Sequence, residues 1–212
     1  MSVSGGWQVK NNIYTLFYAG VLGTVCSLLL TAVASFTAPY QQANKEAEKN
    51  KNILGVLQVP YPAESSSQEL VKIFEDNVRL EKKGELEMYR YVPPKDSGNQ
   101  ETVAVGFEGP GLWGPVKGFL ALDKDMRTIR GVTFYEQEET PGLGGEIAAG
   151  WFREQFIGKS IVDQAGNPGI IISSSEGEAP NKVDAISGAT MTCDKVQAML
   201  NEAISSVVEE KQ

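Results

Sequence analysis

The residues with the clearest capacity for chemistry lie in the string SGATMT at positions 187–192, directly before a segment with a helical pattern. Small residues let a bulky group approach the backbone, and the free N–H groups and dipole at a helix start favour a phosphate. Two hydroxyls, those of Thr190 and Thr192, stand there, and a threonine hydroxyl can be esterified by a phosphate. The alternative is that Ser187, Thr190 or Thr192 only caps the helix, although Lys195 replaces the glutamate of a capping box.

Two glycine-rich loops are further candidates for ligand contacts. The string EETPGLGG at 138–145 lies between a predicted strand and a predicted helix, and its glycines permit close approach of a flat ligand. It matches neither the dinucleotide nor the phosphate-loop pattern, so an ordinary loop is the alternative. The string GPGLWGP at 109–115 contains Trp113. This side chain could form one wall of a pocket for an aromatic ligand, and the alternative is that it only covers the hydrophobic core.

Composition excludes several other classes of chemistry. The 212 residues include no histidine, so a hydrolytic triad that uses histidine is excluded. Cys26 and Cys193 cannot form a structural zinc site unaided, and we expect no metal site and a structural role for both cysteines. The net charge of −8 argues against nucleic-acid binding. Any chemistry is therefore expected to belong to a cofactor.

The segment 13–38 contains no charged residue and is long enough to cross a bilayer as one helix. We expect this transmembrane helix to end near Pro39. A cleaved signal peptide is the alternative, since the segment 32–34 reads Ala-Val-Ala, but the apolar stretch exceeds a typical signal. The flanking charges, led by Lys45, Lys49 and Lys51, lean toward a cytoplasmic C-terminal side.

The remaining pattern predicts an α+β domain with a mostly antiparallel sheet and flanking helices. We expect an N-terminal tail at 1–12, the transmembrane helix at 13–38, a stalk at 39–63 and the globular domain at 64–212. Within the domain, apolar spacing and turn signals predict helices and strands. The predicted helices are 64–82, ended by Lys83-Gly84, then 146–157 and 192–210; the predicted strands are 86–92, 102–107, 116–122, 128–135 and 169–173, with a surface loop at 93–99.

SGATMT, the ETPGLGG loop before it and the single N-terminal anchor together resemble the FMN-binding subunits of two related membrane complexes. These are the C subunit of the Na⁺-translocating NADH:quinone reductase and the G subunit of the Rnf complex, and the resemblance covers most of the chain. The strings GLW, YEQEETPGLGGE and FIGKSI favour the reductase branch, whereas GPVK at 114–117 also resembles the Rnf branch. The Rnf protein therefore remains an alternative, and a cofactor-free membrane-tethered binding protein is an alternative of another class.

The resemblance implies that FMN is attached covalently, as a phosphoester on Thr192. It also implies cofactor contacts in the same loops, with the phosphate and ribityl chain near the SGAT residues and the ring near the glycine-rich turn and the Leu-Trp pair. The implied contact residues are Ser187, Gly188, Ala189 and Thr190 around the phosphate, Glu139, Thr140, Gly142, Leu143 and Gly144 in the turn, Leu112 and Trp113, and Lys182 and Val183.

The resemblance further implies a single-pass protein of the bacterial inner membrane with its FMN domain on the periplasmic side, against the lean of the charge count. It implies relay of single electrons from an iron–sulfur centre at the membrane subunits to a flavin in the B subunit. The implied partners are the B, D and E membrane subunits, the NADH-oxidising F subunit, and a flavin transferase that uses FAD as donor.

Overall fold

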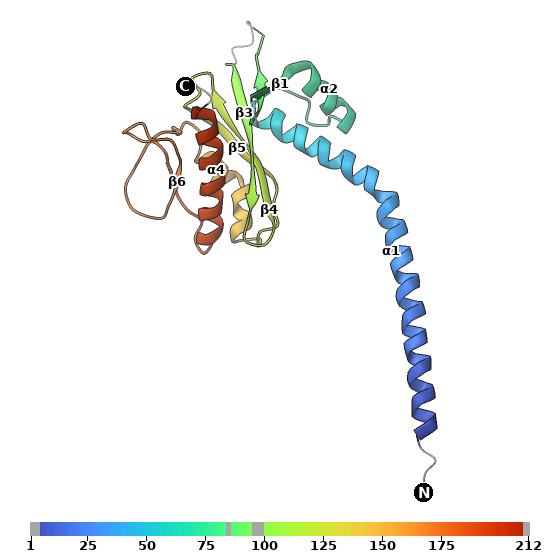
Figure 1. Ribbon diagram of the computed structural model, residues 1–212. Coiled ribbons are helices and arrows are strands. Elements are labelled where there is room, and N and C mark those ends of the chain that lie inside the picture. The colour runs from blue at the N-terminus through green and yellow to red at the C-terminus, as the bar shows by residue number, and fades with distance from the viewer. Residues whose placement is uncertain (1–4, 84–85, 95–99, 210–212) are drawn as a thin grey trace. The chain divides into compact units, whose positions relative to one another are not determined.

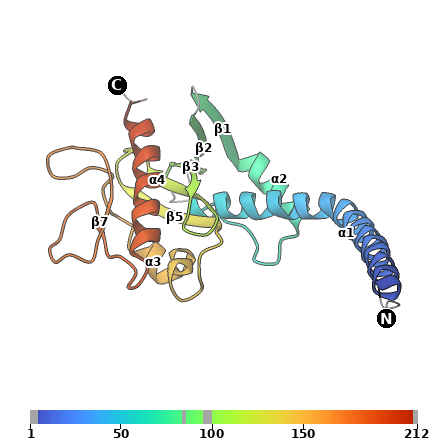
Figure 2. The same cartoon turned by 60° about the horizontal axis from the view of Figure 1, so that its bottom comes forward.

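The computed structural model describes residues 5–83, 86–94 and 100–209, with the side chains of 5–12 and 83 excepted. Two compact units divide the chain, one up to Glu46 and one from Ala47 onward. Most of the elements are labelled in Figure 1, and β2, β7 and α3 are labelled in Figure 2. In chain order they are α1 (Gly5–Val56), α2 (Ser67–Asn77), β1 (Val78–Lys83), β2 (Leu86–Tyr91), β3 (Thr102–Pro110), β4 (Pro115–Asp123), β5 (Ile129–Glu136), the 3₁₀ helix η1 (Gly144–Ala148), α3 (Gly150–Glu154), β6 (Ile171–Ile172), β7 (Lys182–Val183) and α4 (Thr190–Glu209).

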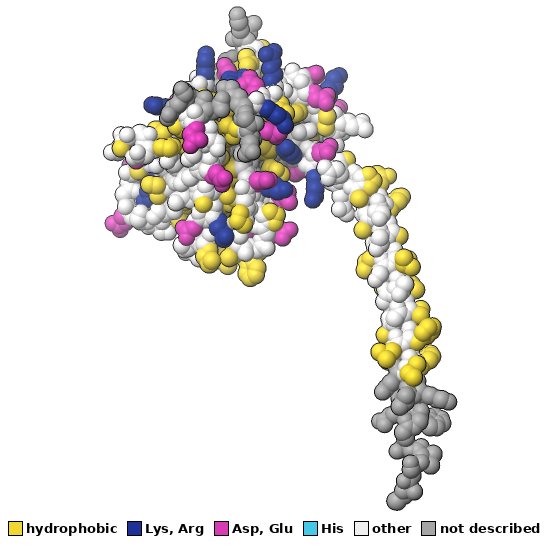
Figure 3. Space-filling view, in the orientation of Figure 1, with side chains coloured by type: hydrophobic (Ala, Val, Ile, Leu, Met, Phe, Trp, Pro, Cys, Tyr) yellow, Lys and Arg dark blue, Asp and Glu magenta, His cyan; other side chains and the backbone are white. Residues whose placement is uncertain are grey.

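Helix α1 is long and apolar enough, over the part from Ile13, to cross a membrane. Its hydrophobic side chains from Ile13 to Tyr40 are exposed, as the yellow surface of the helix in Figure 3 shows. The expected end of the helix at Pro39 is wrong, because Pro39 lies inside α1. A proline removes one helical hydrogen bond, and the Gln, Ala, Glu and Lys residues that follow are good helix formers, so the helix continues to Val56.

The sheet has the order β1-β2-β3-β4-β5, and every neighbouring pair is antiparallel. This confirms the predicted antiparallel α+β domain. A separate parallel pair joins β6 to β7. Side chains alternate between the two faces of a strand, so Val103 and Val105 enter one core cluster while Ala104 between them enters another.

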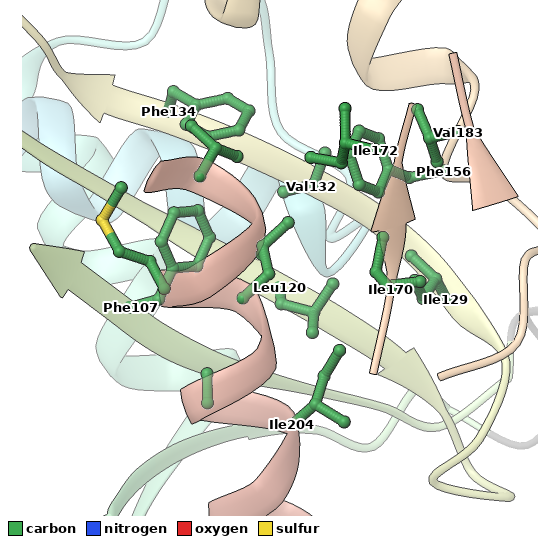
Figure 4. Close-up of a cluster of buried hydrophobic side chains, with 14 of the residues drawn as sticks. Phe107, Leu120, Ile129, Val132, Phe134, Phe156, Ile170, Ile172, Val183 and Ile204 are labelled. Carbon is green, nitrogen blue, oxygen red and sulfur yellow. The ribbon is translucent and has the colours of Figure 1, made fainter. Parts of the chain in front are cut away.

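Helix α4 covers one face of the sheet, and the views of Figures 1 and 2 agree on this placement. Phe107 and Leu120 from the sheet pack with Ile204 of α4 in this cluster, which Figure 4 shows in close-up. On the other face, Ile53 and Leu54 at the end of α1, and Leu57 just after it, pack with residues of β2, β3 and β4.

The compact unit therefore starts at Ala47, whereas we expected a stalk over 39–63 and a domain from 64. The expected stalk contains side chains that are almost completely buried. The polar residues between Gln41 and Lys51 predict a helical stalk, and this segment is indeed helical as part of α1. Only one stripe of a helix has to be apolar for it to pack, so the polar residues did not exclude packing against the domain.

Two predicted helices differ from the observed elements. The helix expected over 64–82 ends at Asn77, and Val78 begins β1, which pairs with β2 and so gains sheet hydrogen bonds. Its start is set by a capping box between Ser66 and Glu69. The helix expected over 146–157 is split into η1 and α3, because Ala149 adopts an extended conformation with φ −69° and ψ 146°.

The predicted strand at 169–173 is reduced to β6. Four predictions fall in part outside the described residues: the tail at residues 1–4, the stop at Gly84, the loop at 95–99 and the last residue, 210, of the terminal helix. From Gly5 the expected tail is already helical.

Candidate functional site

The start of α4 places two threonines in different environments. The chain turns at Gly188, whose φ is +78°, and α4 begins at Thr190. Successive helical residues are about 100° apart around the axis, so residues two apart lie on opposite sides. Thr190 is accordingly exposed, whereas Thr192 is only 2% exposed. The two threonine hydroxyls of the motif are therefore not equivalent.

The buried hydroxyl of Thr192 is bound by a buried carboxylate. Thr192 donates its hydroxyl hydrogen to Oε2 of Glu139 over 2.6 Å, and Glu139 is 5% exposed. The other carboxylate oxygen, Oε1, accepts from the backbone N–H groups of Leu112 at 2.6 Å and Trp113 at 3.2 Å. One glutamate thus joins the β3–β4 loop, the glycine-rich turn and the first turn of α4.

Glycines make this approach possible. A Cβ on Gly144 would lie 2.5 Å from Thr192 Oγ1 and 2.6 Å from Glu139 Oε2, and a Cβ on Gly111 would lie 2.5 Å from Glu139 Oε1. All three distances are shorter than any ordinary van der Waals contact. The turn itself is closed by the carbonyl of Thr140, which accepts from Leu143 N at 3.1 Å and Gly145 N at 2.9 Å.

Exposed apolar side chains surround these loops. Leu112, Trp113 and Leu143 are 41%, 71% and 44% exposed. Leu143 lies beside the start of α4, since a Cβ on Gly188 would meet its Cδ2 at 3.1 Å. A shallow cavity of about 540 Å³ is lined by Leu112, Trp113 and other residues of the β3–β4 loop. Exposed apolar groups beside a polar cluster are typical of a ligand site.

The other predicted site residues are placed as follows. Ser187 and Gly188 lie in the turn before α4, and Ala189 is buried in the core. Lys182 and Val183 form β7, where Val183 is buried in the same core cluster as α4. The Lys182 ammonium donates to the backbone carbonyls of Ser175 and Gly177. Its hydrogen bonds thus go to the 175–177 loop.

Sequence reasoning missed the bond between Glu139 and Thr192 and the role of Gly111. The two bonded residues are 53 positions apart, so no helical or strand spacing relates them. The Gly-Pro-Gly string did mark Gly111 as part of a tight loop, but only the fold shows which side chain a Cβ there would meet.

Cys193, next to Thr192, for which we expected a structural role, is buried in the core. It is 1% exposed, and its Sγ accepts from Ile186 N at 3.4 Å. Burial raises the pKa of this thiol, which disfavours the reactive thiolate.

The residues present fit an FMN phosphate. The first turn of α4 supplies backbone N–H groups that have no partner within the helix. The exposed turn at Gly142, whose φ is +76°, has no atom within 4 Å of the position of an added Cβ, so space is available there. Thr192 supplies the hydroxyl oxygen that a phosphoester requires.

Comparison with known proteins supports an FMN-binding role for this domain. Residues 111–205, which include both loops and the start of α4, match the FMN-binding domain family. The C subunit of the Na(+)-translocating NADH-quinone reductase of Yersinia pestis is 42% identical over 113 residues, which span 52% of this chain but only 42% of that relative's length. The corresponding protein of Pasteurella multocida is 28% identical over 223 residues, spanning 86% of this chain and 85% of the relative.

A solved structure extends the similarity to the fold. The crystal structure of the C subunit of the Na(+)-translocating NADH-quinone reductase from Parabacteroides distasonis superposes with a TM-score of 0.66 at 27% sequence identity, covering 80% of this chain and 94% of that chain. These relatives belong to the reductase branch rather than the Rnf branch. Residues 111–205 therefore form an FMN-binding domain, and the chain as a whole is similar in sequence and fold to the C subunits of the Na⁺-translocating NADH-quinone reductases.

Proposed function

We propose that this chain carries FMN covalently, as a phosphoester on the Thr192 hydroxyl, and that it acts as an electron-transfer subunit. The observation that supports this most directly is the position of Thr192. Its hydroxyl lies in the first turn of α4, within the matched FMN-binding domain, and both loops that the motifs singled out converge on it through Glu139. The Glu139 contact is made by Thr192 and not by Thr190, the other candidate acceptor, which is exposed.

The residues around Thr192 would hold the cofactor at both its phosphate and its ring. The N–H groups at the start of α4, with Ser187, Gly188 and Thr190 in the turn before and at it, would bind the phosphate. Leu112, Trp113 and Leu143 would flank the ring, and their exposure would leave the ring accessible to a redox partner. Bound there, FMN would supply reversible electron acceptance and donation; a covalent link would retain it in this open site.

We further propose that the chain works within a Na⁺-translocating NADH-quinone reductase, as its relatives' names state for them. It would be anchored in the bacterial inner membrane by α1, with the FMN domain on the periplasmic side. It would relay single electrons between an iron–sulfur centre at the membrane subunits and the flavin of the B subunit. The D and E subunits would complete the membrane part, the F subunit would oxidise NADH, and a flavin transferase would attach FMN from FAD.

The covalent link is tested by replacing the two threonines separately. The full chain is expressed with the flavin transferase as wild type, Thr192→Ala and Thr190→Ala, and its intact mass and in-gel flavin fluorescence are measured. Wild type and Thr190→Ala are expected to carry the added mass of one FMN phosphoester, with fluorescence that survives denaturation. Thr192→Ala is expected to lack both, because it has no hydroxyl at the buried position.

Thermal unfolding of each protein is the control for folding. A fluorescent Thr192→Ala band would show that another residue carries the flavin, and a colourless wild type from transferase-containing cells would exclude covalent attachment altogether.

A further inference from the structure

The hydrogen bond from Thr192 to Glu139 has a consequence for how a phosphoester can form at this site. In this structure the partner of the Thr192 hydroxyl is a carboxylate of the same chain, at 2.6 Å. That distance falls in the range of strong O–H···O⁻ hydrogen bonds. It also satisfies the geometric requirement for a general base, which must lie within hydrogen-bond reach of the proton it removes.

The other carboxylate oxygen of Glu139 fixes the orientation of this side chain toward Thr192. The N–H groups of Leu112 and Trp113 bind Oε1, while Oε2 faces Thr192. The packing of the loop reinforces this orientation, since Gly111 and Gly144 leave no space beyond the carboxylate oxygens for a side-chain carbon. Contacts within the protein thus hold the carboxylate in position, as general-base catalysis requires.

The charges around Glu139 then favour one acceptor for the proton that the Thr192 hydroxyl loses. Among the described residues, no ion pair gives Glu139 a cationic partner. A phosphodiester on Thr192 would add a negative charge within contact distance of Oε2, and two like charges so close together repel each other. If Glu139 instead takes the proton that Thr192 loses, the charge of the site stays at one negative unit.

We propose, on the basis of the function proposed above, that Glu139 is a catalytic residue of flavin attachment: it accepts the proton of Thr192 when the phosphoester forms, and it retains that proton in the flavinylated protein. The bond between Thr192 Oγ1 and the FMN phosphorus of FAD forms, and the pyrophosphate bond to the adenylate breaks. The electron pair of that bond leaves with AMP, and the hydroxyl proton moves to Oε2. Neutral Glu139 then donates a hydrogen bond to the phosphoester group.

The substitution Glu139→Gln separates the capacity to accept a proton from the packing of the side chain. Its Oε1 retains the two contacts with the Leu112 and Trp113 N–H groups, but the NH₂ group that replaces Oε2 cannot accept a proton. Glu138 provides a matched control, because it is the adjacent residue and Glu138→Gln makes the same change in charge.

The first measurement is the rate of flavin attachment to the full-length apoprotein, with purified flavin transferase and FAD, followed by intact mass. Loss of a general base typically costs a factor of about 10²–10⁴, so Glu139→Gln is expected to react at least about 100-fold more slowly than wild type. Glu138→Gln is expected to match wild type. An equal rate for Glu139→Gln, or an equal loss for Glu138→Gln, would overturn the proposal.

The second measurement needs only the wild type and therefore decides the matter even if Glu139→Gln does not fold. Infrared difference spectra of the apo and flavinylated proteins at neutral pH are compared, with ¹³C-labelled glutamate to assign the carboxyl bands. Flavinylation is expected to produce the C=O band of one protonated glutamic acid. Its absence from fully flavinylated wild type would overturn the proposal while leaving covalent attachment intact; wild type that acquires no flavin would instead refute the proposed function.

Discussion

At the scale of single residues, the site depends on positions where no side-chain atom can be added. Gly144 is the clearest case, because the space that a Cβ would occupy there is taken by Thr192 Oγ1 and Glu139 Oε2. The backbone of the glycine-rich turn can reach the start of α4 only without that atom. The same hydroxyl and carboxylate are those that we assign to flavin attachment.

Gly144→Ala is therefore expected to disturb the site and the stability of the domain together. Overpacking a well-packed interior typically costs about 1–3 kcal/mol, and the Thr192–Glu139 bond should lengthen or break. Denaturant unfolding measures the first effect, and flavin incorporation, which should fall, measures the second.

Gly55→Ala is the matched control: Gly55 is an exposed residue of α1 with no atom within 4 Å of its Cβ position. That change should leave stability unaltered or raise it by about 0.5–1 kcal/mol. Unchanged stability and incorporation in Gly144→Ala would contradict the close packing.

Individual site residues were predictable where a local string carried them. The strings SGATMT and ETPGLGG point to Thr192 and Glu139 from the sequence alone. Which of the two threonines is buried depends on where α4 begins, and the contact between Thr192 and Glu139 depends on the packing of α4 against the sheet. Both are long-range properties, which a local pattern does not encode.

At the scale of elements, α4 has a second role beyond presenting Thr192. Farther along the helix, Asn201 binds both backbone groups of Ile170: its Oδ1 accepts from Ile170 N at 2.6 Å, and its Nδ2 donates to Ile170 O at 3.2 Å. Gln197 accepts from Ile172 N at 2.7 Å. Side chains of α4 thus replace a neighbouring strand along this segment, which leads into β6.

Asn201→Ala is expected to destabilise the domain, because it leaves the Ile170 N–H without its partner in a residue that is 1% exposed. A buried polar group that loses its partner typically costs about 1–3 kcal/mol. Glu202→Ala, an exposed change on the next residue of the same helix, should stay within about 0.5 kcal/mol of wild type. Chemical denaturation of both variants checks this, with hydrogen exchange at Ile170 as the local readout. Equal stabilities would show that the Asn201 contacts contribute nothing.

The elements that the sequence predicted best were those with their own turn signals. The four strands β2 to β5 were predicted within a few residues, since each is bounded by Gly, Pro or Asp. The elements predicted poorly are those whose conformation depends on a partner. Val78 follows α2 without a break and becomes a strand because β2 is available to pair with it. Pro39 lies within a helix that good helix formers continue.

At the scale of the whole molecule, α1 belongs to both compact units: its apolar part from Ile13 can cross a membrane, and its last turns form one side of the domain core. This gives the chain a natural point of division at Ala47. A chain truncated to begin at Ala47 keeps the buried residues Ile53, Leu54, Val56, Leu57 and Val59, whereas one that begins at Glu64 loses them all.

The two truncated chains are expected to differ sharply. Burial of one large aliphatic side chain contributes about 1.5–3 kcal/mol, so the lost residues together are comparable with the whole stability of a typical domain, about 5–15 kcal/mol. Their removal would also uncover the face of the sheet formed by Phe119 and Ala121. The chain from Ala47 should therefore be soluble, unfold cooperatively and accept FMN. The chain from Glu64 should be unfolded or aggregated. Circular dichroism and thermal melts distinguish the two outcomes. A chain from Glu64 that melts at the same temperature as the chain from Ala47 would show that the end of α1 contributes nothing to the stability of the domain. The opposite result would make the end of the anchor helix a structural part of the site's scaffold, because the sheet that it covers carries both loops that meet at Thr192.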